Sequence, residues 1–308
     1  MTAASERDFL SIDDLSTDEL VALLTSAAEV KREPDSVAAA LEGRDVALIF
    51  EKPSTRTRVS FEAAVNQMGG RAIVLRGDEL QLGRGETIED TARVLSRYVD
   101  AIVVRTFGHD RLERLADASD VPVVNSLSDY SHPCQALADM QTIQEHRGGW
   151  EGKVLTYLGD GNNVAHSLMF AGTKLGMEVR IACPEGYDPD EKVRTRCETI
   201  AGDTGGAVVV THDAGAAAGG AEVLYTDVWA SMGQEDEAEA RRQVFEPYRL
   251  DASALERAAP DAIVMHCLPA HRGEEIAADV IDGPRSVVWD QAENRLHAQK
   301  ALLAWLLA

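Results

Sequence analysis

The sequence predicts an α/β protein with two doubly wound parallel-sheet domains and a ligand-binding cleft between them. Three observations lead to this prediction. The chain has 308 residues, which is longer than a typical single domain of about 150 residues. Short β-branched runs alternate with longer helical patterns, a rhythm typical of parallel strands joined by crossover helices. The glycine-containing segment 147–150 interrupts this rhythm near the middle, where a domain boundary is expected.

The alternation gives each element an expected position. In the first half, strands are expected at 46–50, 72–75, 101–104 and 121–125. In the second half, they are expected at 153–157, 178–182, 208–211, 223–226, 263–266 and 286–289. Helices are expected between them, for instance at 17–33, 57–66, 87–98, 164–175 and 235–245, with a long helix from about His132 and an apolar one from about 294 to the end. The predicted domains are 1–147, on which the helix at 291–308 packs back, and 148–290.

The charge of the chain narrows the choice of partners. It has 30 basic and 52 acidic residues, for a formal net charge of −22, and such a field repels nucleic acid and acidic membranes. Neither is expected as a partner, and any phosphate site must be locally basic. Only six of the basic residues are lysines. An acidic, lysine-poor surface is typical of salt-loving organisms, where salt screens self-repulsion; an ordinary acidic cytosolic protein is the alternative.

Cysteine usage and hydropathy exclude further classes. The four cysteines are scattered and form no C-x-x-C pair, so neither a disulfide framework nor a zinc site is expected, and no metal or cofactor is predicted. No apolar run approaches the about 18–20 residues of a membrane span. The N-terminus lacks the basic and apolar regions of a secretory signal. These features predict a cytoplasmic protein.

The segment STRTR at 54–58 follows the first expected strand and leads into a helix. Pro53 ends the strand, and Ser54 or Thr55 can cap the helix. Unpaired backbone N–H groups and the helix dipole at such an end form an anion site. Arg56 adds a planar guanidinium that matches phosphate oxygens. The alternative is an ordinary helix cap with solvent-facing arginines, and the segment alone leaves both interpretations open.

Two further helix starts carry polar side chains. In the segment HPCQ, His132 and Gln135 lie one turn apart and can reach one ligand, although Pro133 also suits an ordinary first turn. The turn GDGNNV at 159–164 resembles a dinucleotide-binding turn, but Val164 occupies the position of the third glycine. We therefore expect no nucleotide site there, and a turn that presents Asn163 to a ligand.

Two expected strands of the second half end in chemically notable residues. Asp227 opens the segment DVWASMG after strand 223–226, and an aspartate at the carboxyl end of a strand can hold an ammonium group of a ligand. Cys267, in the segment HCLP, follows strand 263–266. It could be a nucleophile, a ligand contact or a buried apolar-like residue. The sequence identifies no general base for it.

In their order along the chain, the motifs STRTR, HPCQ, DVWASMG and HCLP, followed by ENR at 293–295, resemble those of ornithine carbamoyltransferases. The resemblance extends from about Phe9 to Leu307. STRTR and HPxQ are shared with aspartate carbamoyltransferases and imply carbamoyl phosphate, whereas SMG and HCLP imply ornithine. The implied activity transfers the carbamoyl group of carbamoyl phosphate to the δ-amine of L-ornithine, or the reverse in arginine catabolism. A homotrimer or an assembly of trimers is implied as well.

The resemblance also implies roles for the residues at matching positions. The implied catalytic residues are Arg56, Arg105, His132 and Cys267. The implied contacts of carbamoyl phosphate are Ser54, Thr55, Arg56, Thr57, Gln81, Arg105, His132, Pro133, Cys134, Gln135, Cys267, Leu268 and Arg295. The implied contacts of ornithine are Asn163, Asp227, Ser231 and Met232. Cys134 stands where many relatives have threonine, and its side chain is not expected to touch substrate.

Other functions fit these residues less well. A carbamoyltransferase that uses aspartate would need a basic pocket, which the loop containing Asp227 does not supply. Putrescine lacks the α-carboxylate of ornithine, so comparing turnover on the two amines separates these substrates. A Rossmann-type oxidoreductase is disfavoured by the failed glycine pattern. A non-catalytic anion-binding or scaffold protein would have to retain Arg56, Arg105, His132, Cys267 and Arg295 by accident.

Overall fold

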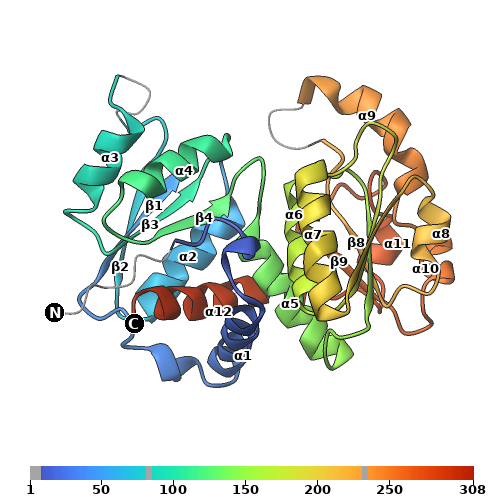
Figure 1. Ribbon diagram of the computed structural model, residues 1–308, viewed down its shortest axis with the longest axis horizontal. Coiled ribbons are helices and arrows are strands. Elements are labelled where there is room, and N and C mark those ends of the chain that lie inside the picture. Colours follow the sequence, from blue (N-terminus) through green and yellow to red (C-terminus); the bar gives the residue numbers. More distant parts are fainter. Residues whose placement is uncertain (1–7, 81–84, 231–234) are drawn as a thin grey trace. The chain divides into compact units, whose positions relative to one another are not determined.

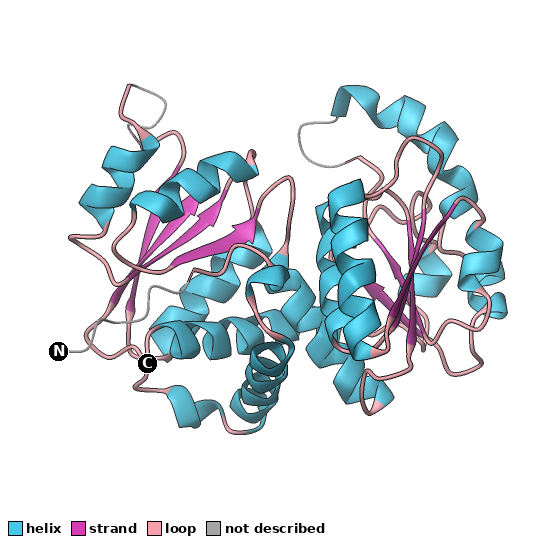
Figure 2. Ribbon diagram, viewed as in Figure 1, coloured by secondary structure: helices cyan, strands magenta, loops and turns pink. Residues whose placement is uncertain are grey.

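The computed structural model describes residues 8–80, 85–230 and 235–308 of the chain. The chain divides into two compact units, the first made of residues up to 138 together with 293–308, and the second of residues 139–292. Each unit is built around one parallel β-sheet, and Figure 2 shows helices on both sides of each sheet. The predicted fold class, two parallel-sheet α/β domains, is confirmed. The points of division lie within two helices, α5 (Pro133–Arg147) and α12 (Val288–Leu306).

The first unit contains a four-stranded sheet in the order β2-β1-β3-β4 (Figure 1). Its strands are β1 (Asp45–Phe50), β2 (Arg71–Arg76), β3 (Ala101–Arg105) and β4 (Val123–Leu127). Its other helices are η1 (Ile12–Asp14), α1 (Thr17–Arg32), η2 (Pro34–Val37), α2 (Thr55–Gln67), α3 (Ile88–Leu95) and α4 (His109–Ala118). Ile49 and Ile102 pack with Leu112 and Leu115 of α4 on one face. Strand side chains alternate between faces, so the other face is buried under α2 and α12 (Figure 1).

The second unit contains a five-stranded sheet in the order β7-β6-β5-β8-β9. Its strands are β5 (Val154–Leu158), β6 (Glu178–Ala182), β7 (Ala207–Thr211), β8 (Val223–Thr226) and β9 (Ile263–His266). Its other helices are α6 (Asn163–Lys174), α7 (Glu191–Thr204), α8 (Ala214–Ala218), η4 (Glu235–Glu237), α9 (Ala238–Phe245), η5 (Glu246–Tyr248), α10 (Ala252–Arg257) and α11 (Ala278–Ile281). One face of the sheet packs Leu224 and Val264 against α8, α10 and α11, and α6 and α7 cover the other face (Figure 1).

Both sheets contain a point where the strand order reverses. In the first unit the chain passes from β1 to β2 on one side and then returns to β3 on the other. In the second unit the same reversal lies between β5 and β8. Ligands of open α/β sheets bind outside the carboxyl ends of the strands at such points. Each unit therefore has one position at which a ligand site is expected from topology alone.

One predicted strand, 286–289, is wrong. Ser286 makes only an isolated parallel bridge to Val264, and helix α12 starts at Val288, earlier than the expected start near 294. Val288, Gln291 and Arg295 are all buried, and this spacing places them on one face of a helix. Tertiary packing of that face outweighs the β propensity of the two valines.

The described residues include no helix that is both long enough and apolar enough to cross a membrane. The C-terminal helix α12 buries Ala301, Leu302 and Leu303 within the protein.

Candidate active site

Ser54 positions the start of helix α2 at the carboxyl end of β1. Its backbone is extended, and its hydroxyl accepts a hydrogen bond from the backbone N–H of Thr57 at 3.3 Å. The first-turn N–H groups of α2 that remain point out of the helix end, where the helix dipole is positive. Thr55 is exposed and Arg56 half-buried in this turn. The loop therefore has the form of an anion site, as the sequence predicts.

Arg105 is the last residue of β3, the neighbouring strand at the switch point. Its backbone carbonyl accepts a hydrogen bond from Glu51 N–H at 2.9 Å, which holds the end of β1 beside it. The pairing of β3 with β4 changes register between Val104 and Arg105, and such irregularities commonly re-aim a side chain next to a functional site. Arg105 is 7% exposed. A rigid strand end thus carries this guanidinium.

Arg295 of α12 links the three helices that border this end of the sheet. The residue is 3% exposed. One guanidinium nitrogen donates to Thr57 Oγ1 at 2.8 Å and the other to Gln135 Oε1 at 2.6 Å. The second nitrogen also lies 3.5 Å from His132 Nε2. These contacts fix the side chains of α2, α5 and α12 in one arrangement. We call Ser54, Arg56, Thr57, Arg105, His132, Gln135 and Arg295 the basic site.

His132 is the electrostatic centre of the basic site. Burial lowers its pKa well below the usual value for histidine, and the positive charges of Arg295, Arg105 and Arg56 lower it further. The imidazole is therefore uncharged at neutral pH and retains one N–H that it can donate. Three guanidinium groups converge on this uncharged ring in a chain whose net charge is −22. Local basicity overrides the global charge, which is what a dianionic ligand requires.

Pro133 and Cys134 follow His132 in the chain, but their side chains are not presented to a ligand as the His132 ring is. Pro133 is buried as the first residue of α5. The Cys134 thiol is fully buried and donates to the carbonyl oxygen of Asn125 at 3.4 Å, and burial raises its pKa to about 12. Its side chain belongs to the core, so only its backbone remains available to a ligand.

Asp227 is the centre of a second cluster, at the carboxyl ends of β5 and β8 in the second unit. It is 7% exposed. Its Oδ1 accepts hydrogen bonds from the Cys267 thiol at 2.9 Å and from Val228 N–H at 2.8 Å, and its Oδ2 lies 3.5 Å from Asn162 Nδ2. A thiol that donates to a carboxylate holds its proton, so Cys267 is not presented as a thiolate nucleophile. We call Asn162, Asn163, Asp227 and Cys267 the acidic site.

Asn162 is a member of the acidic site that the sequence did not single out. Its Oδ1 caps helix α6 by accepting from Val164 N–H at 2.9 Å and Ala165 N–H at 3.3 Å, which leaves its Nδ2 directed at Asp227. Asn163, the predicted ligand residue, is half-buried as the first residue of α6. The cap was detectable as an asparagine before an apolar helix, but its contact with Asp227 depends on the sheet order.

His266 fixes the backbone of the segment 267–269 through a hydrogen bond. Leu268 N–H donates to His266 Nδ1 at 2.8 Å, so the ring proton is on Nε2, which donates to Glu275 Oε1 at 3.1 Å. The backbone of Leu268 has a φ of 57°, in the left-handed region that bulky residues rarely adopt, and surrounding contacts must therefore enforce it. Glu275 is fully buried, and it also accepts from His271 N–H at 2.5 Å. Glu275 is a second positioning residue that the sequence did not single out. A glutamate in a polar loop is normally predicted to be exposed, so its burial gives no local signal.

Substituting Glu275 by alanine is expected to lower the free energy of unfolding by about 2–3 kcal/mol. The buried N–H of the His266 ring and the part-buried N–H of His271 both lose their acceptor. The matched control is Glu274→Ala. Glu274 pairs with Arg242 at 3.1 Å on the surface, and such a pair contributes about 0–1 kcal/mol. Urea unfolding of both variants provides the measurement. Equal losses in the two variants would contradict the supporting role of Glu275.

Three predicted site residues, Gln81, Ser231 and Met232, lie outside the described residues. The others fall into two groups. The basic site, together with its chain neighbours Thr55, Pro133 and Cys134, gathers the predicted residues of the first unit, and the acidic site gathers those of the second. Leu268 adjoins the acidic site through Cys267.

Comparison with known proteins gives matches over almost the whole chain. The carbamoyl-P binding domain of the aspartate/ornithine carbamoyltransferase family matches residues 7–145, and its Asp/Orn binding domain matches residues 151–306. An ornithine carbamoyltransferase from Parafrankia sp. (strain EAN1pec) is 62% identical over 304 residues, covering 98% of this chain and 96% of the relative. The anabolic ornithine carbamoyltransferase of Pyrococcus furiosus is 56% identical over 303 residues, with the same coverage.

Solved structures agree. The ornithine carbamoyltransferase structure from Pyrococcus furiosus has a TM-score of 0.95 at 55% identity, covering 100% of this chain and 99% of that one. The structure of the Gloeobacter violaceus enzyme has a TM-score of 0.89 at 50% identity, covering 98% of each chain.

Proposed function

The chain belongs to the aspartate/ornithine carbamoyltransferase family, and we propose how its residues carry out the reaction of an ornithine carbamoyltransferase. The reaction transfers the carbamoyl group of carbamoyl phosphate to the δ-amine of L-ornithine and releases L-citrulline and phosphate. The observation that carries the assignment is identity of 55–62% with ornithine carbamoyltransferases over nearly the full length. The basic site suits carbamoyl phosphate, and the acidic site suits ornithine.

Carbamoyl phosphate is assigned to the basic site. The loop at 54–57, with the hydroxyls of Ser54 and Thr55 and the charge of Arg56, faces the phosphate. Arg105 bridges the phosphate and the carbonyl oxygen. The proposed contacts of the carbamoyl group are Thr57, His132, Pro133, the backbone of Cys134, Gln135, Cys267, Leu268 and Arg295. Gln81 completes the phosphate contacts in this proposal and acts from its own or a neighbouring chain.

Ornithine is assigned to the acidic site. Asp227, whose carboxylate is buried and hydrogen-bonded, would attract an ammonium group of the amino acid. Asn163 supplies a neutral polar contact, and Ser231 and Met232 complete the proposed set. A carboxylate at this position disfavours the amino acid aspartate as a substrate. The acidic site therefore accounts for specificity and the basic site for the leaving group.

The proposed mechanism is electrostatic. The uncharged δ-amine of ornithine attacks the carbonyl carbon, and the bond from that carbon to the phosphate oxygen breaks. The departing phosphate accepts the proton that the amine loses and leaves as the hydrogen phosphate dianion. The reaction therefore needs no general base from the protein. Thr57, Arg105 and His132 donate hydrogen bonds to the oxygen on which negative charge develops, and one such donor contributes about 2.7–4 kcal/mol. Cys267 positions the amino acid and forms no covalent intermediate.

A colorimetric citrulline assay tests the assignment. The purified chain is supplied with carbamoyl phosphate and either ornithine, putrescine or aspartate. Turnover with ornithine is expected to exceed that with the other amines by at least about 100-fold, because groups built to bind the missing carboxylate or amine stay unpaired. Preference for putrescine would contradict the ornithine assignment. Carbamoylation of aspartate above ornithine would place the chain in the other branch of the family.

Cellular context and assembly form a separate proposal. We propose a cytoplasmic homotrimer, or an assembly of trimers. A sedimentation coefficient that corresponds to the mass of one chain would contradict this proposal.

The synthetic direction is favoured because the Pyrococcus furiosus relative is named an anabolic enzyme. Operation in the arginine deiminase pathway uses the same residues in reverse. A rate of citrulline phosphorolysis above the rate of synthesis, at equal substrate concentrations, would favour the catabolic assignment.

The melting temperature is expected to rise between dilute and molar potassium chloride. The net charge of −22 destabilises the folded state through self-repulsion, and a Debye length of about 3 Å at 1 M salt removes most of it. Thermal unfolding across a salt series measures the effect. A melting temperature that is flat across the series would contradict the proposed adaptation to salt.

A further inference from the structure

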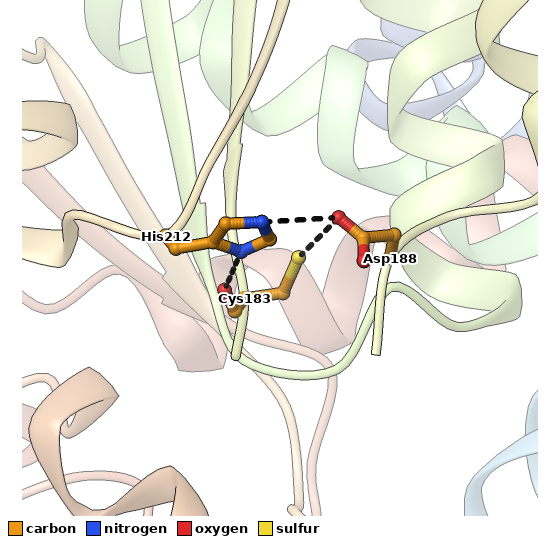
Figure 3. A group of neighbouring side chains, drawn as sticks. All are labelled: Cys183, Asp188 and His212. Atoms are coloured by element: carbon orange, nitrogen blue, oxygen red, sulfur yellow. Dashed lines mark hydrogen bonds and ion pairs between the residues drawn. The ribbon is translucent and has the colours of Figure 1, made fainter. Parts of the chain in front are cut away.

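Cys183, Asp188 and His212 form a cluster at the carboxyl ends of β6 and β7, toward the opposite lateral edge of the second sheet from β9 and Cys267. Cys183 directly follows β6, His212 directly follows β7, and Asp188 lies in the loop between β6 and α7. Figure 3 shows the three side chains pointing toward one another. One ligand atom from each, the thiol, a carboxylate oxygen and an imidazole nitrogen, lie within 4.8 Å of one another. No role in carbamoyl transfer is assigned to any of these residues.

The orientation of His212 is set by the main chain. Its Nδ1 lies 2.8 Å from the carbonyl oxygen of Cys183. A carbonyl only accepts, so Nδ1 carries the proton and, in the neutral ring, Nε2 carries the lone pair. That lone pair faces Asp188 Oδ1 at 3.8 Å. Histidines that bind metal ions usually donate their other N–H to a carbonyl in this way, which fixes both the tautomer and the direction of the ring.

A group that donates to both acceptors, or a cation, can lie between them. The Cys183 thiol, 3.9 Å from the same Asp188 oxygen, favours a metal ion, because a thiol is a preferred ligand of zinc. We propose that Cys183, Asp188 and His212 bind one divalent ion of the zinc class.

The distances suit such an ion after a small adjustment. Tetrahedral zinc, with bonds of about 2.0–2.3 Å, holds its ligand atoms about 3.3–3.7 Å apart. The observed separations of 3.8 Å and 3.9 Å exceed the upper end of this range by about 0.1–0.2 Å, and the thiol and the imidazole nitrogen lie within 4.8 Å of each other. Asp188 and His212 are exposed, so their side chains can move this far and water can supply the fourth ligand. The buried thiol of Cys183 anchors the inner side of the site.

The surroundings favour a cation. The carboxylates of Asp188 and Asp160 carry negative charge close to the Cys183 thiol. An entering ion displaces the thiol proton to solvent, as metal ions do with coordinating thiols. Backbone bonds hold the frame: Cys183 N–H donates to Thr211 at 3.1 Å, and the Tyr248 hydroxyl donates to the carbonyl of His212 at 2.8 Å. The ion would connect the ends of β6 and β7 to the loop that precedes α7.

Two other groups in the described parts of the chain bring potential ligands equally close, but neither is as suitable. In the first, Asp227, His266 and Cys267, both ring nitrogens of His266 are already engaged by Leu268 N–H and Glu275. The second group, made of His271, Glu274 and Glu275, contains no thiol. A probe that reports a metal–thiolate bond therefore excludes the second group, and substitution of Cys183 or Cys267 separates the remaining two.

Titration of the chelator-stripped full-length chain with Co²⁺ tests the proposal. One equivalent is expected to bind with a sulfur-to-cobalt charge-transfer band in the near ultraviolet, and Zn²⁺ is expected to displace it. His212→Gln and Asp188→Asn, both at exposed positions, are expected to weaken Co²⁺ binding by at least about 10-fold. Cys183→Ser is expected to abolish the band. Zn²⁺ should also raise the melting temperature of the unsubstituted chain and not of His212→Gln.

The controls are Cys197→Ser and Cys267→Ser. Cys197 is buried in α7 outside the cluster, and both variants are expected to retain the band. Absence of the band from the unsubstituted chain would overturn the proposal. Loss of the band in Cys267→Ser with retention in Cys183→Ser would move the metal to the acidic site and would equally overturn it. Binding that is unaffected by His212→Gln and Asp188→Asn would exclude the proposed ligand set.

Discussion

Arg105→Ala is expected to lower kcat by about 100- to 1,000-fold, the effect of removing one donor to a developing oxyanion. Arg105 bridges phosphate and carbonyl oxygen in the proposed mechanism, so its loss weakens stabilisation of both the leaving group and the oxyanion. Its side chain leaves the buried end of β3. Binding of ornithine depends on the acidic site and should change much less than kcat. Steady-state kinetics with each substrate varied in turn measures both quantities.

Arg58→Ala is the matched control for this prediction. Arg58 belongs to the same arginine-rich segment, but it is exposed and its guanidinium pairs with Glu62 one turn along α2 at 3.5 Å. Its removal changes the net charge as much as removal of Arg105 does. A general electrostatic effect would therefore lower kcat equally in both variants, whereas the proposed mechanism requires near-normal turnover in Arg58→Ala. Near-normal kcat in Arg105→Ala would exclude the electrostatic mechanism itself.

The strands of this fold were predictable because their signals are local. Buried parallel strands such as β1 and β3 are continuous runs of β-branched and apolar residues, and glycine or proline marks their ends. The segment 286–289 carries the same local signal and is nevertheless the end of a turn and the start of α12. What decides its structure is the burial of Gln291 and Arg295 on the same helical face, and that contact depends on the assembled unit.

The candidate site was predictable in part for the same reason. Ser54 and Asn163 stand at helix starts, and Arg105 and Asp227 at strand ends, so local patterns and the resemblance placed them near a ligand. The supporting residues carry no such local signal. Asn162 reaches Asp227 only because β5 and β8 are neighbours, and Glu275 reaches His266 through a loop whose path the sequence does not indicate. Cys183 and His212 come together only through the pairing of β6 with β7.

Asp227→Asn is expected to raise the KM for ornithine by about 10- to 150-fold, the range of a hydrogen bond to a charged group, with little change in carbamoyl phosphate binding. The substitution keeps the size of the side chain and one acceptor oxygen, so Val228 N–H and the Cys267 thiol retain a partner. What disappears is the negative charge that attracts an ammonium group. Carbamoyl phosphate lies among the guanidinium groups around His132 in the proposed mechanism, and it makes no contact that requires this charge.

Asp203→Asn controls for the loss of one acidic charge, because Asp203 is exposed on α7 and belongs to neither site. Calorimetric titration with carbamoyl phosphate, followed by steady-state kinetics with ornithine, separates the two substrates in both variants. If Asp227→Asn weakened carbamoyl phosphate binding as much as ornithine binding, the residue would be supporting the whole structure and not selecting the amine. If the KM for ornithine were unchanged, the ammonium group would have to be bound elsewhere. A selective rise in Asp227→Asn, absent from Asp203→Asn, is the result that assigns the choice of substrate to the acidic site and leaves stabilisation of the transition state to the basic site.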